Sequence, residues 1–235
     1  MKTDDYEFYE ESFNILDNEY SLWMKEKTNL LLKLFEGKKI VEVGCGNGLL
    51  LKNFPREKFE FMGIDFSKGN LEHAKKKNPD LSFFQADLTK ESSWTEYKNK
   101  FDTVLCSEVI EHIQDDNLAL HILNSLLKPN GTLVITVPAF PSLLSKFDIK
   151  EGHVRRYTKK SISKVVINAG FEIEEIRYWN IFGFFGWLVF FKILDLDFKQ
   201  STNSFFSSLM GNFLKIESKI KFPFGQTVIL KARKL

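Results

Sequence analysis

A glycine-rich turn at residues 41–50, VEVGCGNGLL, constrains this chain more than any other stretch. A short apolar strand leads into Gly44, Gly46 and Gly48, and a leucine-rich helix start follows. Glycines at alternate positions allow a sharp turn with positive φ and let a ligand approach the backbone amides. The third glycine comes one residue too early for the dinucleotide pattern GxGxxG, and the loop lacks the Lys-Ser or Lys-Thr ending of a P-loop. The turn therefore predicts a ligand site that is neither a pyrophosphate cradle nor a P-loop.

Apolar segments of strand length recur along the chain, and helical patterns separate them. Strands and helices that alternate in this way predict an α/β fold with a parallel sheet, whose ligands bind at the carboxyl ends of the strands. The expected strands are 39–43, 59–64, 81–86, 101–106, 132–137, 171–178 and 227–232. We expect one domain over residues 1–235, with an N-terminal helical cap at 1–36 and a helical insertion at 181–224.

Composition places the chain among ordinary globular proteins. Hydrophobic residues make up 43% and charged residues 27%, which excludes a disordered or fibrous chain. The net charge is only +2, from 33 basic and 31 acidic side chains, so no broad positive field favours a nucleic-acid partner. Only two cysteines are present and the first residues are acidic, which argues against a disulfide framework and a secretory signal. We therefore expect a cytoplasmic protein.

Asp65 ends the second expected strand, beside the end of the first strand in a parallel sheet. Its two carboxylate oxygens can accept both hydrogen bonds from a ribose diol. The alternative is that Asp65 caps the helix that follows, but Ser67 can provide that cap as well. The sequence therefore favours a ribose-binding role for Asp65.

The turn resembles motif I of the class I S-adenosylmethionine-dependent methyltransferases, in which an acidic residue precedes GxGxG, and Glu42 supplies that acid. Asp87, at the end of the third expected strand, resembles the acid of motif II, which lies near the adenine amino group. The resemblance implies a Rossmann-like three-layer sandwich around a mostly parallel seven-stranded sheet with an antiparallel last strand. It also implies S-adenosylmethionine as the cofactor, bound by Glu42, Gly44, Cys45, Gly46, Gly48, Asp65, Phe66, Ala86, Asp87, Leu88 and Ser107.

The segment 107–113, SEVIEHI, contains residues that could act in the reaction as metal ligands or as a base. If a helical turn begins here, Glu108, Glu111 and His112 fall on one face, and His153 from a later loop can join them. Carboxylates with an imidazole suit Mg²⁺ or Mn²⁺ better than zinc. The alternatives are a metal-free catalytic base among His153, Glu108 and His112, or side chains that are solvated or hold the loop.

This ExxEH block with a later histidine resembles the metal-dependent O-methyltransferases of ubiquinone biosynthesis and the enzymes that methylate small-RNA 3′ ends. In those families the metal grips two adjacent hydroxyls of the acceptor. The same Glu-His pair also occurs in class I methyltransferases that bind no metal. The resemblance therefore leaves both the metal-bound and the metal-free alternatives open.

The segment 152–158, GHVRRYT, is similar to the GHxRRYT that follows the fifth strand in the type 11/12 branch of class I methyltransferases. Arg155, Arg156 and Tyr157 combine two anion-binding groups with a phenol, a composition that suits contact with the substrate. The alternative is that one arginine pairs with Glu108 or Glu111 and the other is solvated.

The insertion contains two apolar stretches. Residues 181–194 are apolar all round but too short to span a membrane, and residues 204–220 have the apolar spacing of an amphipathic helix. One interpretation is a helical hairpin that covers the active site or packs a homodimer. The other is a cap for a lipid-like acceptor, with peripheral membrane contact through 181–220.

These features together predict methyl transfer from S-adenosylmethionine to a small-molecule or lipid-linked acceptor. The ExxEH block favours oxygen as the accepting atom. One alternative is an RNA-hydroxyl methyltransferase, which the charge balance disfavours. Another is a non-catalytic protein that binds S-adenosylmethionine and uses the insertion as a scaffold surface.

Overall fold

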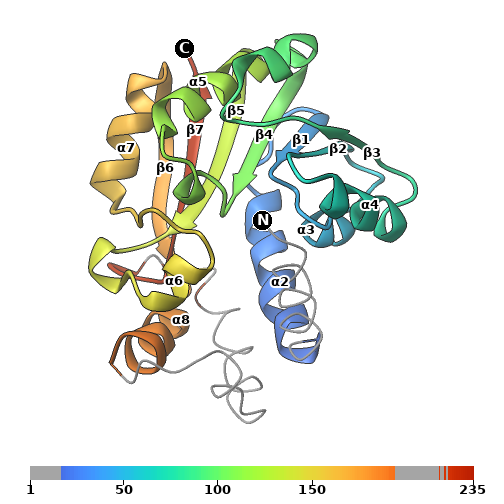
Figure 1. The fold of residues 1–235 in the computed structure, drawn as a ribbon. Helices are drawn as coiled ribbons and strands as arrows, with labels where there is room; N and C mark the ends of the chain where they lie inside the picture. The colour runs from blue at the N-terminus through green and yellow to red at the C-terminus, as the bar shows by residue number, and fades with distance from the viewer. Residues whose placement is uncertain (1–16, 194–216, 218–219, 221) are drawn as a thin grey trace.

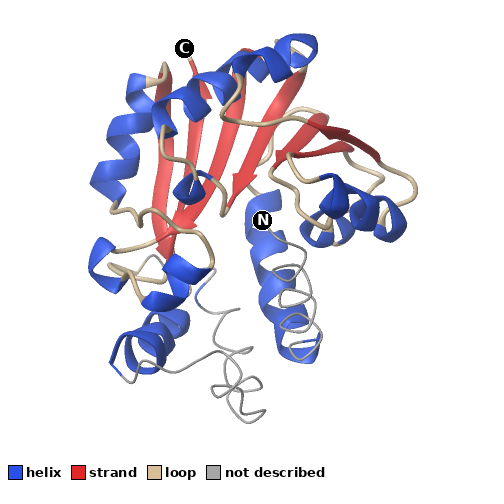
Figure 2. Ribbon diagram, viewed as in Figure 1, coloured by secondary structure: helices blue, strands red, loops and turns tan. Residues whose placement is uncertain are grey.

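The computed structural model describes residues 17–193, 217, 220 and 222–235, and its centre is one seven-stranded sheet (Figures 1 and 2). The strand order is β3-β2-β1-β4-β5-β7-β6. The strands are β1 (Lys39–Val43), β2 (Glu60–Asp65), β3 (Ser82–Gln85), β4 (Phe101–Ser107), β5 (Leu127–Pro138), β6 (Phe171–Trp179) and β7 (Thr227–Lys234). Strands β1 to β5 pair in parallel, whereas β7 pairs antiparallel with both β5 and β6. The predicted mostly parallel sheet with an antiparallel last strand is confirmed.

Helices cover both faces of this sheet and make three layers. One face carries α2 (Asp17–Leu32), α3 (Leu49–Lys52) and α4 (Lys68–Lys77), and the other carries the 3₁₀ helix η1 (Glu91–Tyr97), α5 (Asp116–Leu126) and α7 (Lys159–Asn168). The two layers form because side chains alternate along each strand. In β1, Ile40 packs into the cluster with Leu31 of α2, while Val41 packs into the cluster with Leu123 of α5.

Side-chain caps set where several helices begin. Ser67 Oγ accepts a hydrogen bond from Asn70 N (3.3 Å) at the start of α4, and Asp115 caps α5 through Leu118 N (3.0 Å). Thr158 begins α7 with a capping box. Ser67 thus supplies the side-chain cap of α4, and Asp65 accepts a hydrogen bond from Ser67 N (2.8 Å) just before this helix.

Irregular segments and short helices lie beyond the carboxyl ends of the central strands. They are η2 (Ile110–His112), η3 (Pro141–Leu143), α6 (Lys146–Lys150), α8 (Ile181–Gly186) and the π-helix η4 (Trp187–Ile193). Figure 1 shows α2, α6 and α8 below the arrowheads of β4 and β5. Since ligands of parallel sheets bind at this edge, these elements surround the expected site.

Two expected elements differ from the structure. Glu108 has φ 55° and the following helical turn is a single 3₁₀ turn, so Glu108, Glu111 and His112 do not share one α-helical face as expected. Strand β5 begins at Leu127 instead of 132, because Leu127 pairs with Phe101 before a shift in register. Both differences come from pairing with neighbouring strands, which local sequence patterns do not report.

The structure describes only part of the insertion. The apolar segment from residue 181 forms α8 and η4, while the amphipathic helix expected over 204–220 lies outside the described residues except for 217 and 220. Glu217 is buried and accepts a hydrogen bond from Ile181 N (2.8 Å) at the start of α8. Arg177 of β6 donates to Glu217 O (3.0 Å). None of the described helices is long and apolar enough to cross a membrane.

Candidate active site

The glycine turn between β1 and α3 has the geometry of a ligand-binding loop. Gly44, Gly46 and Gly48 all have positive φ, at 76°, 51° and 73°. A Cβ on Gly44 would lie 2.3 Å from Val109 Cγ2, and one on Gly48 would lie 2.7 Å from Asn78 Nδ2. A Cβ on Gly46 would meet nothing within 4 Å. Gly44 and Gly48 are therefore needed for packing, while Gly46 faces open space where a ligand can approach.

Asp65 fastens this turn to the end of β2. Its Oδ2 accepts a hydrogen bond from Gly46 N (2.9 Å) and its Oδ1 accepts one from Ser67 N (2.8 Å). Burial raises the pKa of Asp65, although these backbone hydrogen bonds oppose the shift. Next to it, the Phe66 side chain is 57% exposed. An exposed aromatic ring beside the loop offers a surface on which a base can stack, so the predicted roles of both residues stay open to test.

Glu42 is a buried carboxyl group near the carboxyl end of β1. Its side chain is 3% exposed, and its Oε2 has no hydrogen-bond partner among the described residues. Burial raises its pKa to about 8, while the nearby Lys27 ammonium lowers it. A buried polar atom without a partner is costly in a closed protein. Glu42 thus fits a site in which a bound ligand supplies the missing donor.

Asp87 holds its own loop after β3. Thr89 donates to Asp87 Oδ1 through both N (2.9 Å) and Oγ1 (2.7 Å), and Lys90 Nζ lies 3.2 Å from Oδ2. Burial acts to raise the pKa of Asp87, but these hydrogen bonds outweigh it and lower the pKa. The flanking Ala86 and Leu88 are both buried in the core. The predicted contact with adenine stays a prediction for these three residues.

Ser107 and Glu108 form a small polar network at the end of β4. Ser107 Oγ and Thr136 Oγ1 are 2.9 Å apart, and Thr136 Oγ1 donates to Glu108 Oε1 (2.8 Å). Glu108 Oε1 also lies 3.5 Å from Lys27 Nζ, which comes from α2. The Glu108 carboxylate therefore already has two partners, the Thr136 hydroxyl and the Lys27 ammonium group.

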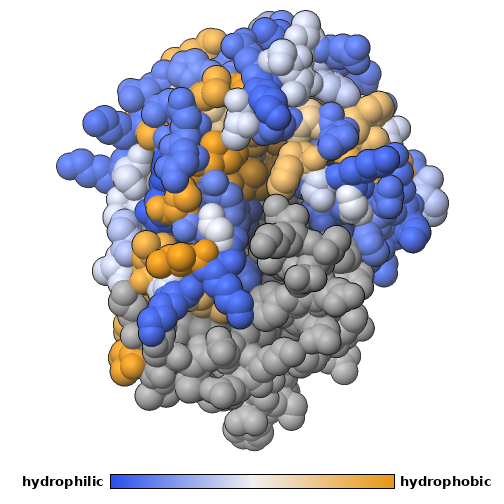
Figure 3. All heavy atoms as spheres, viewed as in Figure 1, coloured by the Kyte–Doolittle hydropathy of each residue, from blue (hydrophilic) through white to orange (hydrophobic). Residues whose placement is uncertain are grey.

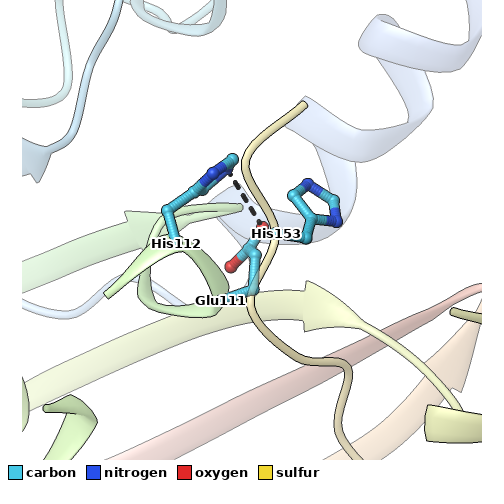
Figure 4. Close-up of side chains that lie close together, drawn as sticks. All are labelled: Glu111, His112 and His153. Carbon is cyan, nitrogen blue, oxygen red and sulfur yellow. Dashed lines mark ion pairs between the residues drawn. The ribbon is translucent and has the colours of Figure 1, made fainter. Parts of the chain in front are cut away.

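Glu111, His112 and His153 lie together at the same end of the sheet (Figure 4). One possible ligand atom from each residue lies within 4.8 Å of the other two. The ring centroids of His112 and His153 are 4.6 Å apart. The side chain of Glu111 is fully buried, and neither of its oxygens has a hydrogen-bond partner among the described residues. The structure thus brings together three of the four predicted metal ligands, while Glu108 is outside this group.

The titration behaviour of this cluster follows from its burial. Burial, and then the negative charge of Glu108, raise the pKa of Glu111 well above its usual range. Burial, and then the neighbouring His153, lower the pKa of His112 to about 4. His112 is therefore neutral at pH 7, with a lone pair that a metal could use, and the lowered pKa makes it a weak base.

Three side chains of GHVRRYT have partners within the protein, and their predicted contact with substrate stays a prediction. Arg156 is 4% exposed and pairs with Asp148, with Nη2 2.7 Å from Oδ1. Tyr157 is 3% exposed and its hydroxyl donates to Asp116 Oδ2 (2.8 Å). The partly exposed Arg155 pairs with the same Asp116 oxygen at 2.6 Å. The alternative, in which one arginine pairs with Glu108 or Glu111, is wrong about the partner, because Arg155 and Arg156 pair with Asp116 and Asp148 instead.

Two charged residues of the site escaped the sequence analysis. Lys27 is 4% exposed and interacts with Glu42, Glu108 and Glu111 from α2, but a lysine among helical residues gives no local signal of such a role. Asp148 is fully buried and accepts a hydrogen bond from His153 Nδ1 (2.9 Å). Its only sequence signal is the Ser-x-x-Asp pattern of a helix start.

The fold and the glycine turn define the class of protein, and a comparison with known families agrees. A family model described as a methyltransferase domain matches residues 16–176, which is more than half of the chain. The chain belongs to this methyltransferase-domain family. The predicted membership of the class I S-adenosylmethionine-dependent methyltransferases is confirmed, and S-adenosylmethionine is the cofactor that defines this class.

Individual relatives share shorter regions. The ubiquinone biosynthesis O-methyltransferase of Alkalilimnicola ehrlichii is 35% identical over 105 residues, which cover 43% of this chain and 42% of the relative. The enzyme of the same name from Psychrobacter arcticus is 27% identical over 170 residues, covering 61% of this chain and 66% of the relative. The match thus spans less than half of the first of these relatives.

A solved structure shows the same fold. The S-adenosylmethionine-dependent methyltransferase from Archaeoglobus fulgidus has a TM-score of 0.61 with this chain. It covers 89% of this chain and 92% of its own chain at 18% identity. The similarity therefore extends over nearly all of both folds, although few residues are shared.

Proposed function

We propose that this protein transfers the methyl group of S-adenosylmethionine to an oxygen atom of a small-molecule or lipid-linked acceptor. The observation that carries the proposal is the cluster of Glu111, His112 and His153 at the carboxyl end of the sheet, on which the glycine turn also opens. The relatives named above carry O-methyltransferase in their names, which supports oxygen as the accepting atom. The near-neutral net charge gives RNA no comparable support.

The chain's own residues have few tasks in such a reaction. The cofactor supplies a methyl group on a sulfonium, which is already a good leaving group. The protein must hold the reactants in line and take the proton from the acceptor hydroxyl. The open face of Gly46 and the carboxyl groups of Glu42 and Asp65 are our candidates for contact with the cofactor, and His153 and His112 are our candidates for the base.

The same cluster fits a divalent metal ion. Glu111 offers a buried carboxylate whose oxygens lack partners among the described residues, and two imidazoles complete three possible ligands. Asp148 holds Nδ1 of His153, as a carboxylate often holds a metal-binding histidine. Two nitrogen donors favour Mn²⁺ over Mg²⁺, which prefers oxygen. A bound metal would supply Lewis-acid chemistry to acceptor oxygens.

Replacing Glu111 with glutamine should lower the affinity for Mn²⁺ by about tenfold or more, because the only carboxylate of the cluster is lost. The measurement is the metal content and Mn²⁺ titration of protein purified without a histidine tag. Glu108→Gln is the matched control and should bind Mn²⁺ as the wild type does, because Glu108 lies outside the cluster. An active wild-type enzyme that is metal-free and insensitive to chelators would exclude the metal.

A lipid-linked acceptor has separate support from the insertion. Phe185, Val189 and Ile193 follow one another at four-residue intervals along α8 and η4 and are 50%, 41% and 66% exposed. Figure 3 shows a small group of apolar atoms at the lower left, in the region of α8 and η4. Exposed apolar side chains aligned on a short helical segment are typical of a surface that contacts lipid or another apolar partner.

A methyl-transfer assay with labelled S-adenosylmethionine tests both the reaction and the acceptor class. Hydroxylated aromatic acceptors with and without a long alkyl tail are compared in the presence of anionic vesicles. We expect the tailed acceptor to have a kcat/KM on the order of tenfold higher, because its tail adds apolar burial, and Val189→Glu to remove that advantage. Equal rates for both acceptors would exclude the lipid-linked class. Cofactor binding without transfer to any acceptor would favour the scaffold alternative.

A further inference from the structure

Asp148 is a fully buried carboxylate that accepts hydrogen bonds from three neighbouring residues. Its Oδ1 accepts from His153 Nδ1 (2.9 Å) and Arg156 Nε (2.9 Å), and its Oδ2 accepts from the backbone N (2.7 Å) and Oγ (2.8 Å) of Ser145. Both of its oxygens are therefore used by donors, and the adjacent guanidinium balances its charge. A carboxylate held in this way has little freedom to move.

This arrangement determines which nitrogen of His153 carries the proton in the neutral ring. A carboxylate oxygen can only accept, so Nδ1 must be the donor and Nε2 must hold the lone pair. The lone pair is the part of an imidazole that binds a metal or accepts a proton. Asp148 thus controls the chemical form in which His153 enters the cluster with Glu111 and His112.

The insertion covers one side of the ion pair between Asp148 and Arg156. The Arg156 guanidinium lies 4.5 Å from the ring centroid of Trp187, the first residue of η4. Trp187 donates from Nε1 to Leu143 O (3.3 Å), and its ring meets Phe147 of α6 edge-on at 5.5 Å. An aromatic ring over the guanidinium keeps water from the pair and strengthens it. The start of the insertion is thereby connected to His153 through Arg156 and Asp148.

We propose that Asp148 is a positioning residue that fixes the tautomer and orientation of His153, and that Trp187 of the insertion holds the Asp148–Arg156 pair in place. This inference rests on the proposed function, because it gives His153 a part in the reaction. It extends that function by assigning the insertion a role in the reaction centre as well as on the surface. Asp148 touches neither cofactor nor acceptor in this role and acts through His153 alone.

The test is ¹⁵N NMR of the histidine side chains, which requires no turnover. In the wild-type protein with the ring neutral, His153 should show the Nδ1-protonated pattern. Asp148→Asn should change that pattern, since the amide of asparagine can offer a donor to Nδ1. Asp116→Asn is the matched control, because Asp116 pairs with Arg155 and Tyr157 of the same loop but does not bond to His153, and it should leave the pattern unchanged.

The kinetic consequence provides a second readout. Asp148→Asn should lower kcat by about ten- to a hundredfold and leave the KM for S-adenosylmethionine unchanged, as expected for the loss of a residue that orients a reactive histidine. Trp187→Phe, which keeps a ring but loses the bond to Leu143, should have a smaller effect in the same direction.

The outcomes separate this inference from the proposed function. A wild-type protein that binds S-adenosylmethionine but carries the His153 proton on Nε2 would overturn the positioning role alone. The Nδ1-protonated pattern in a protein that binds no S-adenosylmethionine would support the positioning geometry and overturn the methyl-transfer reaction. Because the wild-type spectrum is sufficient for this decision, a variant that fails to fold does not prevent the test.

Discussion

Gly46→Ala should lower the affinity for S-adenosylmethionine on the order of tenfold or more while leaving the protein folded. Gly46 is the one glycine of the turn whose added Cβ would meet no protein atom within 4 Å, so the methyl group would enter the space open to a ligand. A steric cost of about 1.4 kcal/mol in the complex corresponds to a tenfold loss of affinity. Because φ at Gly46 is 51°, alanine should also cost about 1 kcal/mol of folding stability.

Isothermal titration with S-adenosylmethionine, combined with thermal unfolding, checks this result. Gly69→Ala is the matched control, since Gly69 lies within α4 and an added Cβ meets only Ser67 Oγ at 3.9 Å. This variant should bind the cofactor as the wild type does and be slightly more stable, because alanine favours a helix. Unchanged affinity in Gly46→Ala would mean that the cofactor does not approach this part of the turn.

Glu42→Gln should stabilise the ligand-free protein by on the order of 4 kcal/mol at pH 8 and much less near pH 5. The pKa of Glu42 is raised from 4.5 to about 8 in the folded protein, mainly by burial. The folded state therefore keeps a proton that the unfolded state releases above pH 4.5. Its contribution to stability is fully present below pH 4.5 and is lost as the pH rises through 8. Glutamine removes this loss because it does not ionise.

The measurement is the unfolding free energy in urea at pH 5 and pH 8, without cofactor. Glu60→Gln is the control, because Glu60 is exposed on β2, and it should change stability little at either pH. We also expect Glu42→Gln to weaken cofactor binding, so that a gain in stability accompanies a loss of function. A variant that is no more stable than the wild type at pH 8 would show that Glu42 is ionised at little cost.

The features that could be predicted from the sequence are those encoded over short distances. The alternation of Ile40 and Val41 between two helical layers follows from the two-residue repeat of a strand, and the positive φ of Gly46 follows from a motif of a few residues. Asp65 at the end of its strand needed only the rule that parallel strands end at one edge. These inferences required no knowledge of side-chain contacts.

The remaining features depend on contacts between distant residues. Glu108 has a left-handed backbone and a hydrogen bond from Thr136 of the neighbouring strand, and it is not among the three grouped ligand candidates. Arg156 appeared suited to bind an acceptor, but the buried Asp148 and the ring of Trp187 enclose it. A sequence pattern shows which chemical groups are present, but their partners are set by packing that only the folded chain shows.

The position of β7 between β5 and β6 also affects how the chain can assemble during synthesis. β6 makes its ladder with β7 and is separated from β5 by it, so β6 cannot join the sheet before residues 227–234 have left the ribosome. Strands β1 to β5 pair only with one another up to that point and can form earlier. The half of the sheet that carries the glycine turn would therefore form first, and β6 would join it only after β7 has been made.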